Sequence, residues 1–175
     1  MVAYLNIHTS YDLLNSSLRI SDVVNKAKNE GIETLAITDT NVLYGYPKFY
    51  DACIEAGIHP VFGMTVYLTD GLYQLETVLL AQNNDGLKDL YQLSSAIKMK
   101  EKEDIPIEWL KRYANHLIII FKGVEEHHQL FIEAFHDKKH VYLNQDCIAI
   151  ENRSFVWLNT CLLYTSDAAD EEDSV

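Results

Sequence analysis

The sequence predicts an α/β domain built around a mainly parallel β-sheet. Short aliphatic runs typical of buried strands alternate along the chain with segments whose apolar residues recur at helical spacing. Such alternation indicates βαβ units, and both a doubly wound sheet and a β/α barrel satisfy it. A length of 175 residues corresponds to one domain, and 48% hydrophobic with 23% charged residues suits a folded core.

The opening strand and the first helix have recognisable boundaries. The apolar run over 2–8 reads as a buried strand. We expect Ser21 to cap the following helix, because a serine oxygen accepts hydrogen bonds from the first free amides of a helix. Gly31 is expected to end that helix in the left-handed conformation that glycine favours. The run 34–38 then predicts a second short strand.

The second helix is delimited by a proline and a glycine. Pro47 suits the first helical turn, where its missing N–H has no partner to lose, and Gly57 is expected to end the helix. The strand that follows covers 58–68, with a bend at Gly63. The side chains that this helix is expected to bury are Phe49, Tyr50, Cys53 and Ile54.

The second half of the chain continues the alternation. Asp70 and Gly71 form a turn signal, and a strand over 73–81 follows. Asn84 is expected to cap a helix over 84–97, and the charged segment 98–106 is expected to be a surface loop. The remaining expected elements are a helix over 107–113, a strand over 117–121, a helix over 124–135 and short strands near residues 141, 148 and 156.

The net charge and the cysteines indicate the class of partner and the cellular compartment. The formal net charge is −12 and no basic patch interrupts it, so direct nucleic-acid binding by this surface is not expected. The odd set of widely spaced cysteines, Cys53, Cys147 and Cys161, predicts free thiols in the reducing cytoplasm. We find no signal peptide, and the longest aliphatic stretch, 117–121, is far too short to span a membrane.

The last residues differ in composition from the rest. Residues 162–175 contain five acidic residues and no basic one. An acidic tail of this kind is typical of disorder. The run CLLYTSDAAD that begins at Cys161 also resembles peptides produced when adapter DNA is translated, and we prefer that interpretation. We therefore divide the chain into a domain over 1–161 and a tail over 162–175.

Two strand ends carry residues that could bind metal. Asn6 and His8 share one side of the first strand and reach its carboxyl end, where β/α folds place their chemistry. Asp39 follows the second strand. A lone histidine is more often a hydrogen-bonded structural residue, and an aspartate in this position often caps a turn. The histidines that we expect to be solvent-exposed are His127, His128 and His136.

Four sequence blocks in the first 95 residues resemble the conserved motifs of a known family. They read YLNIHTSYDLLN at 4–15, LAITDTNVLYGYPKFY at 35–50, AGIHPVFG at 56–63 and LLAQNNDGLKDLYQLS at 79–94. In this order they resemble the PHP (polymerase and histidinol phosphatase) domain of the alpha subunits of bacterial DNA polymerase III. Its first block reads roughly H-x-H-T-x-Y-S-L-L-D-G, and its second L-A-I-T-D-H-G-N-M-Y-G-x-x-x-F-Y. The resemblance implies a distorted β/α barrel, of which this chain is a truncated N-terminal part.

The departures from this pattern bear on metal binding. Active PHP domains use a cluster of His, Asp and Glu ligands in a multi-metal phosphoesterase site. The positions at which this chain differs are Asn6 and Thr40 for His, Asn15 for Asp, Thr65 for Glu, and Glu76 where many relatives have His. His8 and Asp39 remain as vestigial metal positions. Because a catalytic zinc needs about three protein ligands, the resemblance implies a degenerate, metal-free domain without catalytic or cofactor-binding residues.

For function, the resemblance implies a structural and docking part of a DNA-directed DNA polymerase. The parent chain would carry out template-directed DNA synthesis in replication, with Mg²⁺ held by carboxylates outside this chain. The implied partners are the remainder of the alpha chain and other replisome subunits, with DNA contacted only through the parent. One alternative is a stand-alone, histidinol-phosphatase-like phosphoesterase, which metal content and phosphatase activity would reveal. The other is a binding module without chemistry.

Overall fold

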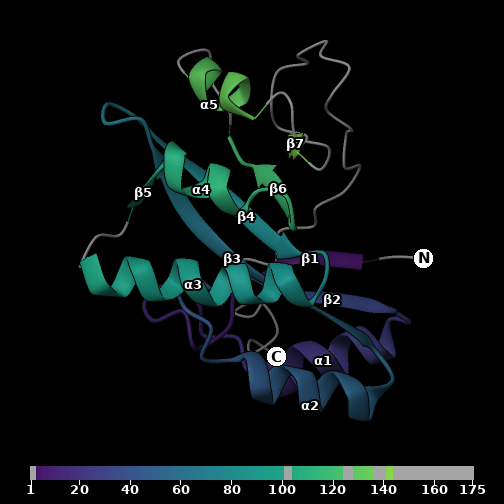
Figure 1. The fold of residues 1–175 in the computed structure, drawn as a ribbon. Helices are drawn as coiled ribbons and strands as arrows, with labels where there is room; N and C mark the ends of the chain where they lie inside the picture. Colours follow the sequence, from purple (N-terminus) through teal and green to yellow (C-terminus); the bar gives the residue numbers. More distant parts are fainter. Residues whose placement is uncertain (1–2, 101–103, 124–127, 136–140, 144–175) are drawn as a thin grey trace.

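The structure is a computed structural model that describes residues 3–100, 104–123, 128–135 and 141–143. These residues form a seven-stranded sheet in the order β1-β2-β3-β4-β6-β7, with β5 paired to β3 (Figure 1). The sequence predictions that lie outside the described residues concern Cys147, Cys161, His127, His136, the strands near 148 and 156, and the tail over 162–175.

Most elements match the sequence expectation within a few residues. The strands are β1 (Ala3–Ile7), β2 (Thr34–Ile37), β3 (His59–Thr69), β4 (Gln74–Ala81), β5 (Asp104–Pro106), β6 (Leu117–Phe121) and β7 (Val141–Leu143). The helices are α1 (Ile20–Asn29), α2 (Tyr46–Ala56), α3 (Asn84–Lys100), α4 (Ile107–Tyr113) and α5 (Gln129–Ala134).

The strand pairs that the structure describes are mainly parallel, as expected, and the exceptions are the two pairs that involve β4. Strands β1, β2 and the first part of β3 run parallel, but β4 is antiparallel to both of its neighbours, β3 and β6. The physical reason is the short turn after β3. Its Asp70 carboxylate accepts hydrogen bonds from the amides of Leu72 and Tyr73, each 2.8 Å long. A connection this short can only join antiparallel neighbours, since a parallel pair needs a crossover of about a dozen residues.

The glycines that were predicted to end α1 and α2 do so, but the predicted N-cap of α1 is wrong. Gly31 follows α1 with a φ of 71°, and Gly57 ends α2 with a φ of 76°. Pro47 lies in the first turn of α2. Ser21 does not cap α1, because the helix already begins at Ile20 and the Ser21 hydroxyl donates to Asp22 instead.

Helix α2 buries a narrower face than we expected. Tyr46, Phe49 and Cys53 are buried, and Cys53 is a free thiol as predicted. Tyr50 and Ile54 are 48% and 55% exposed, so their predicted burial is wrong. The three buried residues recur at intervals of three and four, which places them on one side of the helix.

Helix α3 starts and ends differently from the expectation. Asn83 rather than Asn84 is the cap, since its side-chain oxygen accepts hydrogen bonds from the amides of Asp85 and Gly86, each 3.0 Å long. The helix continues to Lys100. The segment predicted as a loop over 98–106 therefore contributes the end of α3 and strand β5, which pairs in parallel with the end of β3.

Helices cover one side of a curled sheet. Helices α1 and α2 lie side by side and pack with β1 and β2 around one core, while α3, α4 and α5 cover β3, β4 and β6 around another (Figure 1). We call the opposite side of the sheet the inner face. It carries a smaller apolar cluster, formed by Ala36, Val78, Leu80 and Ile120 with the partly buried Leu5, Val61, Ile118 and Tyr142. This curled, open sheet is the partial, distorted β/α barrel that the sequence predicts.

Among the described helices, none has both the length and the apolar character needed to cross a bilayer.

Candidate functional site

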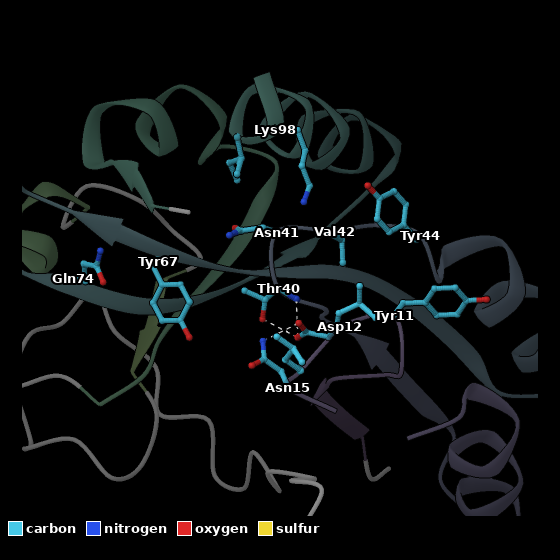
Figure 2. Close-up of a pocket in the computed structure, with 13 residues that line it drawn as sticks. Tyr11, Asp12, Asn15, Thr40, Asn41, Val42, Tyr44, Tyr67, Gln74 and Lys98 are labelled. Carbon is cyan, nitrogen blue, oxygen red and sulfur yellow. Dashed lines mark hydrogen bonds between the residues drawn. The ribbon is translucent and has the colours of Figure 1, made fainter. Parts of the chain in front are cut away.

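The candidate site lies where β1 and β2 end. A pocket of about 890 Å³ opens there, between the loops that follow these strands, the end of α3 and the β3–β4 hairpin (Figure 2). Asp12, Asn15 and Thr40 line its floor, and Tyr67 and Lys98 line its sides. The site therefore occupies the edge of the sheet at which β/α folds place binding groups.

Three potential metal ligands come together in this region. His8, Asp12 and Asp39 each offer a ligand atom, and these atoms lie within 4.8 Å of one another. His8 and Asp39 are the positions that the sequence analysis singled out, and the parallel pairing of β1 with β2 places them side by side. By distance alone, the three side chains could hold an ion.

The Asp12 carboxylate is the centre of a hydrogen-bond network. Its Oδ2 lies 2.6 Å from Nδ1 of His8 and accepts hydrogen bonds from the Thr40 amide at 3.0 Å and the Thr40 hydroxyl at 2.8 Å. Its Oδ1 accepts a 2.9 Å hydrogen bond from the Asn15 side-chain amide. Asp12 is only 3% exposed, so these protein donors take the place of water around the carboxylate.

The same donors determine the charge state of Asp12. Burial would raise the pKa of this carboxyl group, because removal from water disfavours the charged form. The hydrogen bonds that it accepts, from His8 first and then from Thr40 and Asn15, outweigh burial and lower the pKa from 3.8 to about 2. Asp12 is therefore an ionised carboxylate at neutral pH.

At Asp39 the effect of burial on the pKa outweighs the effect of the hydrogen bonds. Burial raises the pKa of its carboxyl group from 3.8 to about 6, although hydrogen bonds from Thr9 oppose the rise. The Thr9 amide donates to Oδ1 at 2.6 Å, and the Thr9 hydroxyl donates to Oδ2 at 2.8 Å. Asp39 thus ties the loop after β1 to the end of β2, and it is the more easily protonated of the two acids.

The other residues that differ from the family pattern form hydrogen bonds or ion pairs within the protein. Asn6 is buried and accepts a 2.8 Å hydrogen bond from the Thr38 hydroxyl. Thr65 is also buried, and its hydroxyl donates to the Thr38 carbonyl at 2.8 Å. Glu76 is not part of the cluster of potential ligands, and it forms an ion pair with Lys122, the residue that follows β6.

The predicted exposure of His128 is wrong. His128 is 6% exposed, and its Nε2 lies 3.2 Å from the Gln74 carbonyl oxygen, to which it can donate. Its ring also contacts the edges of the Tyr73 and Phe131 rings. The residue therefore belongs to the packing of α5 against the β3–β4 hairpin.

Sequence reasoning did not identify Asp12. The signal was present, because aligning the family pattern with residues 6–16 places its serine at Asp12 and its aspartate at Asn15. The acid thus lies three residues earlier than in the pattern. Only the fold shows that Thr40, which follows a different strand, contacts Asp12.

The raised pKa of Asp39 predicts a pH-dependent stability. A folded-state pKa near 6 against 3.8 in the unfolded chain means that the folded state binds the proton more tightly. This stabilising contribution is full below pH 4 and is lost as the pH rises through 6, with a total change of about 3 kcal/mol. The free energy of unfolding should therefore fall between pH 4 and pH 7 in the parent protein, and less so in Asp39→Asn.

Urea unfolding at a series of pH values, followed by circular dichroism, measures this difference. Asp51→Asn, an exposed acid on α2, removes the same charge and should leave the wild-type pH profile unchanged. Parallel profiles for the parent and Asp39→Asn would contradict the assignment of the shift to Asp39.

Comparisons with known proteins agree with this architecture. The sequence profile of the PHP domain matches residues 5–155. The DNA polymerase III subunit alpha of Staphylococcus epidermidis strain RP62A is 63% identical over 170 residues, and that of Staphylococcus aureus strain COL is 56% identical over the same length. These alignments cover 97% of the chain but only 16% of each relative, so the chain spans about a sixth of their length.

One solved structure supports the fold alone. A putative metal-dependent phosphoesterase from Bifidobacterium adolescentis superposes with a TM-score of 0.51 and 12% sequence identity. The superposition covers 75% of this chain and 74% of that protein. At this identity the likeness concerns the arrangement of strands and helices and not the chemistry.

Proposed function

We propose, from the premise that this chain belongs to the PHP domain family, that it is the PHP part of a replicative DNA polymerase III alpha subunit. In this role it supports the polymerase and provides a docking surface, and it does not hydrolyse phosphoesters. The identity of 63% to a polymerase alpha subunit over nearly the whole chain is the observation that carries the polymerase assignment.

The hydrogen bonding of the two acids supports a site without metal. A carboxylate has about four lone-pair sites, and four donors already converge on Asp12. Both oxygens of Asp39 also accept hydrogen bonds. A metal ion would have to displace these donors, and the threonines and asparagines nearby offer it no charge in return. The residues present therefore fit a metal cluster poorly, and we derive no catalytic step from one.

The inner face and the sheet edges support the docking role. Leu5, Val61, Ile118 and Tyr142 remain only partly buried on the inner face. Among the described strands, β1 pairs only with β2 and β7 pairs only with β6. The occupant that we propose for this face is the remainder of the polymerase chain, since about five-sixths of the relatives' length lies outside this chain.

The activity of the parent follows from the same assignment. It is template-directed DNA synthesis, with Mg²⁺ held by carboxylates in a part of the polypeptide outside this chain. Other replisome subunits are further partners, and DNA is contacted through the parent alone, consistent with the net charge of −12. The cytoplasm is the proposed location.

The rival function is that of a metal-dependent phosphoesterase. The observation in its favour is the spacing of His8, Asp12 and Asp39, whose ligand atoms lie within 4.8 Å of one another. Three such ligands with an open position would satisfy a catalytic zinc. Under this rival, Asp12 would replace the family's missing ligands.

Metal content and phosphatase activity separate the two functions. The intact polymerase chain should contain substoichiometric zinc and manganese by mass spectrometry after purification without chelator. It should not hydrolyse p-nitrophenyl phosphate when either metal is added, and His8→Ala should leave this background unchanged. One bound metal per chain, together with a phosphatase activity that His8→Ala abolishes, would contradict the proposed function.

A further inference from the structure

The site around Asp12 has the charge pattern of a metal site with its signs exchanged. A bound metal ion is a positive charge surrounded by oxygen and nitrogen acceptors. Here the central group is an ionised carboxylate, and the atoms around it are hydrogen-bond donors at 2.6 to 3.0 Å. The donors come from His8 and Asn15, after β1, and from Thr40, after β2. Figure 2 shows Asn15 and Thr40 close to Asp12.

These donors occupy positions at which the family pattern has metal-ligand residue types. His8 matches the second histidine of the first block, Asn15 replaces its aspartate, and Thr40 replaces the histidine after Asp39. Asn15 and Thr40 each exchange a group that could ligate a cation for one that donates a hydrogen bond. The serine of the pattern becomes Asp12, so the central negative charge appears at the point where these donors meet.

We infer that the Asp12 carboxylate is a built-in replacement for the metal, which joins the loop after β1 to the loop after β2 through His8, Asn15 and Thr40. This inference rests on the metal-free site of the proposed function and assigns a positioning role to Asp12. A metal cluster holds strand ends together by binding ligands from several strands. In this chain the carboxylate makes the same connection through hydrogen bonds.

The loop after β1 has a backbone conformation that its surroundings must impose. Leu14, between Asp12 and Asn15, has a φ of 71° and a fully exposed side chain. Leucine rarely adopts this left-handed conformation, which persists only where the surroundings impose it. The amides of Asn15 and Ser16 donate to the Asp12 carbonyl, and the Ser16 hydroxyl donates to the His8 carbonyl. Asp12 therefore anchors the loop through both its backbone and its side chain.

Hydrogen exchange in the intact polymerase chain tests the connection. Asp12→Asn keeps the size of the side chain but removes its charge and turns one acceptor into a donor, which faces the donors of the network. Peptides from both loops, residues 8–16 and 38–45, should exchange about tenfold faster or more, because hydrogen bonds to a charged group are stronger than neutral ones. Asp51→Asn is the matched control and should leave both peptides unchanged.

A double-mutant cycle then tests whether the change in hydrogen exchange comes from the contact between Asp12 and Thr40. Thr40→Val removes the hydroxyl donor and keeps the shape of the side chain. The change that Thr40→Val causes should be much smaller in the Asp12→Asn background than alone, because its hydroxyl acts through the carboxylate. Faster exchange confined to residues 8–16, or fully additive effects, would overturn the inference even if the chain binds no metal.

The metal content of the same samples separates this inference from the proposed function. Bound metal that disappears in Asp12→Asn would make Asp12 a ligand and overturn both. Bound metal that persists in Asp12→Asn, with the coupling to Thr40 intact, would overturn the metal-free function and leave Asp12 as the connection between the loops. The expected result is a metal-free chain in which Asp12 and Thr40 are coupled.

Discussion

Residues 1–161, produced without the rest of the polymerase polypeptide, are expected to be insoluble or loosely folded. The reason is that the sheet formed by the described residues is open on one side. Its inner face carries apolar residues from several strands, and Leu5, Val61, Ile118 and Tyr142 are only partly buried there. Leaving such side chains in contact with water forfeits about 25 cal/mol for each Å² of apolar surface that a closed barrel would bury.

The strands at the two ends of the sheet are a second reason to expect aggregation. In the described part of the chain, β1 and β7 each pair with one neighbour only, so each presents an unpaired row of backbone N–H and C=O groups. Exposed edges of this kind pair with other chains and promote aggregation. A closed barrel has no such edges, since its first and last strands complete the ring.

Size-exclusion chromatography and thermal melting by circular dichroism measure the outcome. Residues 1–161 should elute as aggregates or melt without a cooperative transition. The intact polymerase chain, prepared in parallel, should give a soluble species with a sharp transition that includes this domain. A soluble monomer of residues 1–161 with a sharp, cooperative melt would show that the inner face and edges need no cover.

Most helices and strands could be predicted from the sequence because their signals are local. Gly57 and Pro47 mark the ends of α2 directly, and the aliphatic run over 117–121 is strand β6 as expected. The direction of β4 is a different case. Strand periodicity says nothing about pairing, and only the turn signal at Asp70 and Gly71 indicates that β3 and β4 form an antiparallel hairpin.

The candidate site could be predicted only in part. His8 and Asp39 stand out because each follows a buried strand, and parallel pairing of these strands brings them together. Asp12 lies in a loop, and its importance depends on Thr40, which is 28 residues away in sequence. Local patterns do not report such a contact, and no periodicity distinguishes this aspartate from the other acids of the chain.

Gly86→Ala is expected to destabilise the domain strongly, although alanine is the better helix former. Gly86 is buried in the first turn of α3, where the helix passes over the turn that leads into β6. A Cβ at this position would collide with the His116 carbonyl oxygen and lie 3.2 Å from the Cα of Ala81. Both obstacles are backbone atoms at the ends of neighbouring strands, so neither can rotate away.

The backbone must therefore move, and the loss should exceed what alanine contributes to the helix. Overpacking costs about 1 to 3 kcal/mol and occasionally more, and we expect the upper end here because backbone atoms block the Cβ. The gain in helix propensity is only about 1 kcal/mol. The His116 carbonyl also accepts a 3.1 Å hydrogen bond from the Gln82 amide, which the displacement would break. Because α3 carries Ile97 and Lys98 to the wall of the pocket, a shifted helix should also alter the site.

Urea unfolding of the intact chain, with hydrogen exchange of residues 84–100 and 116–121, measures this effect. Gln92→Ala, at an exposed position on the same helix, is the control and should change the unfolding midpoint little. Gly86→Ala should lower the midpoint and speed exchange in both segments. Equal midpoints for the two variants would mean that α3 can move away from the His116 turn at little cost, and the close packing of this helix would then not be needed for stability.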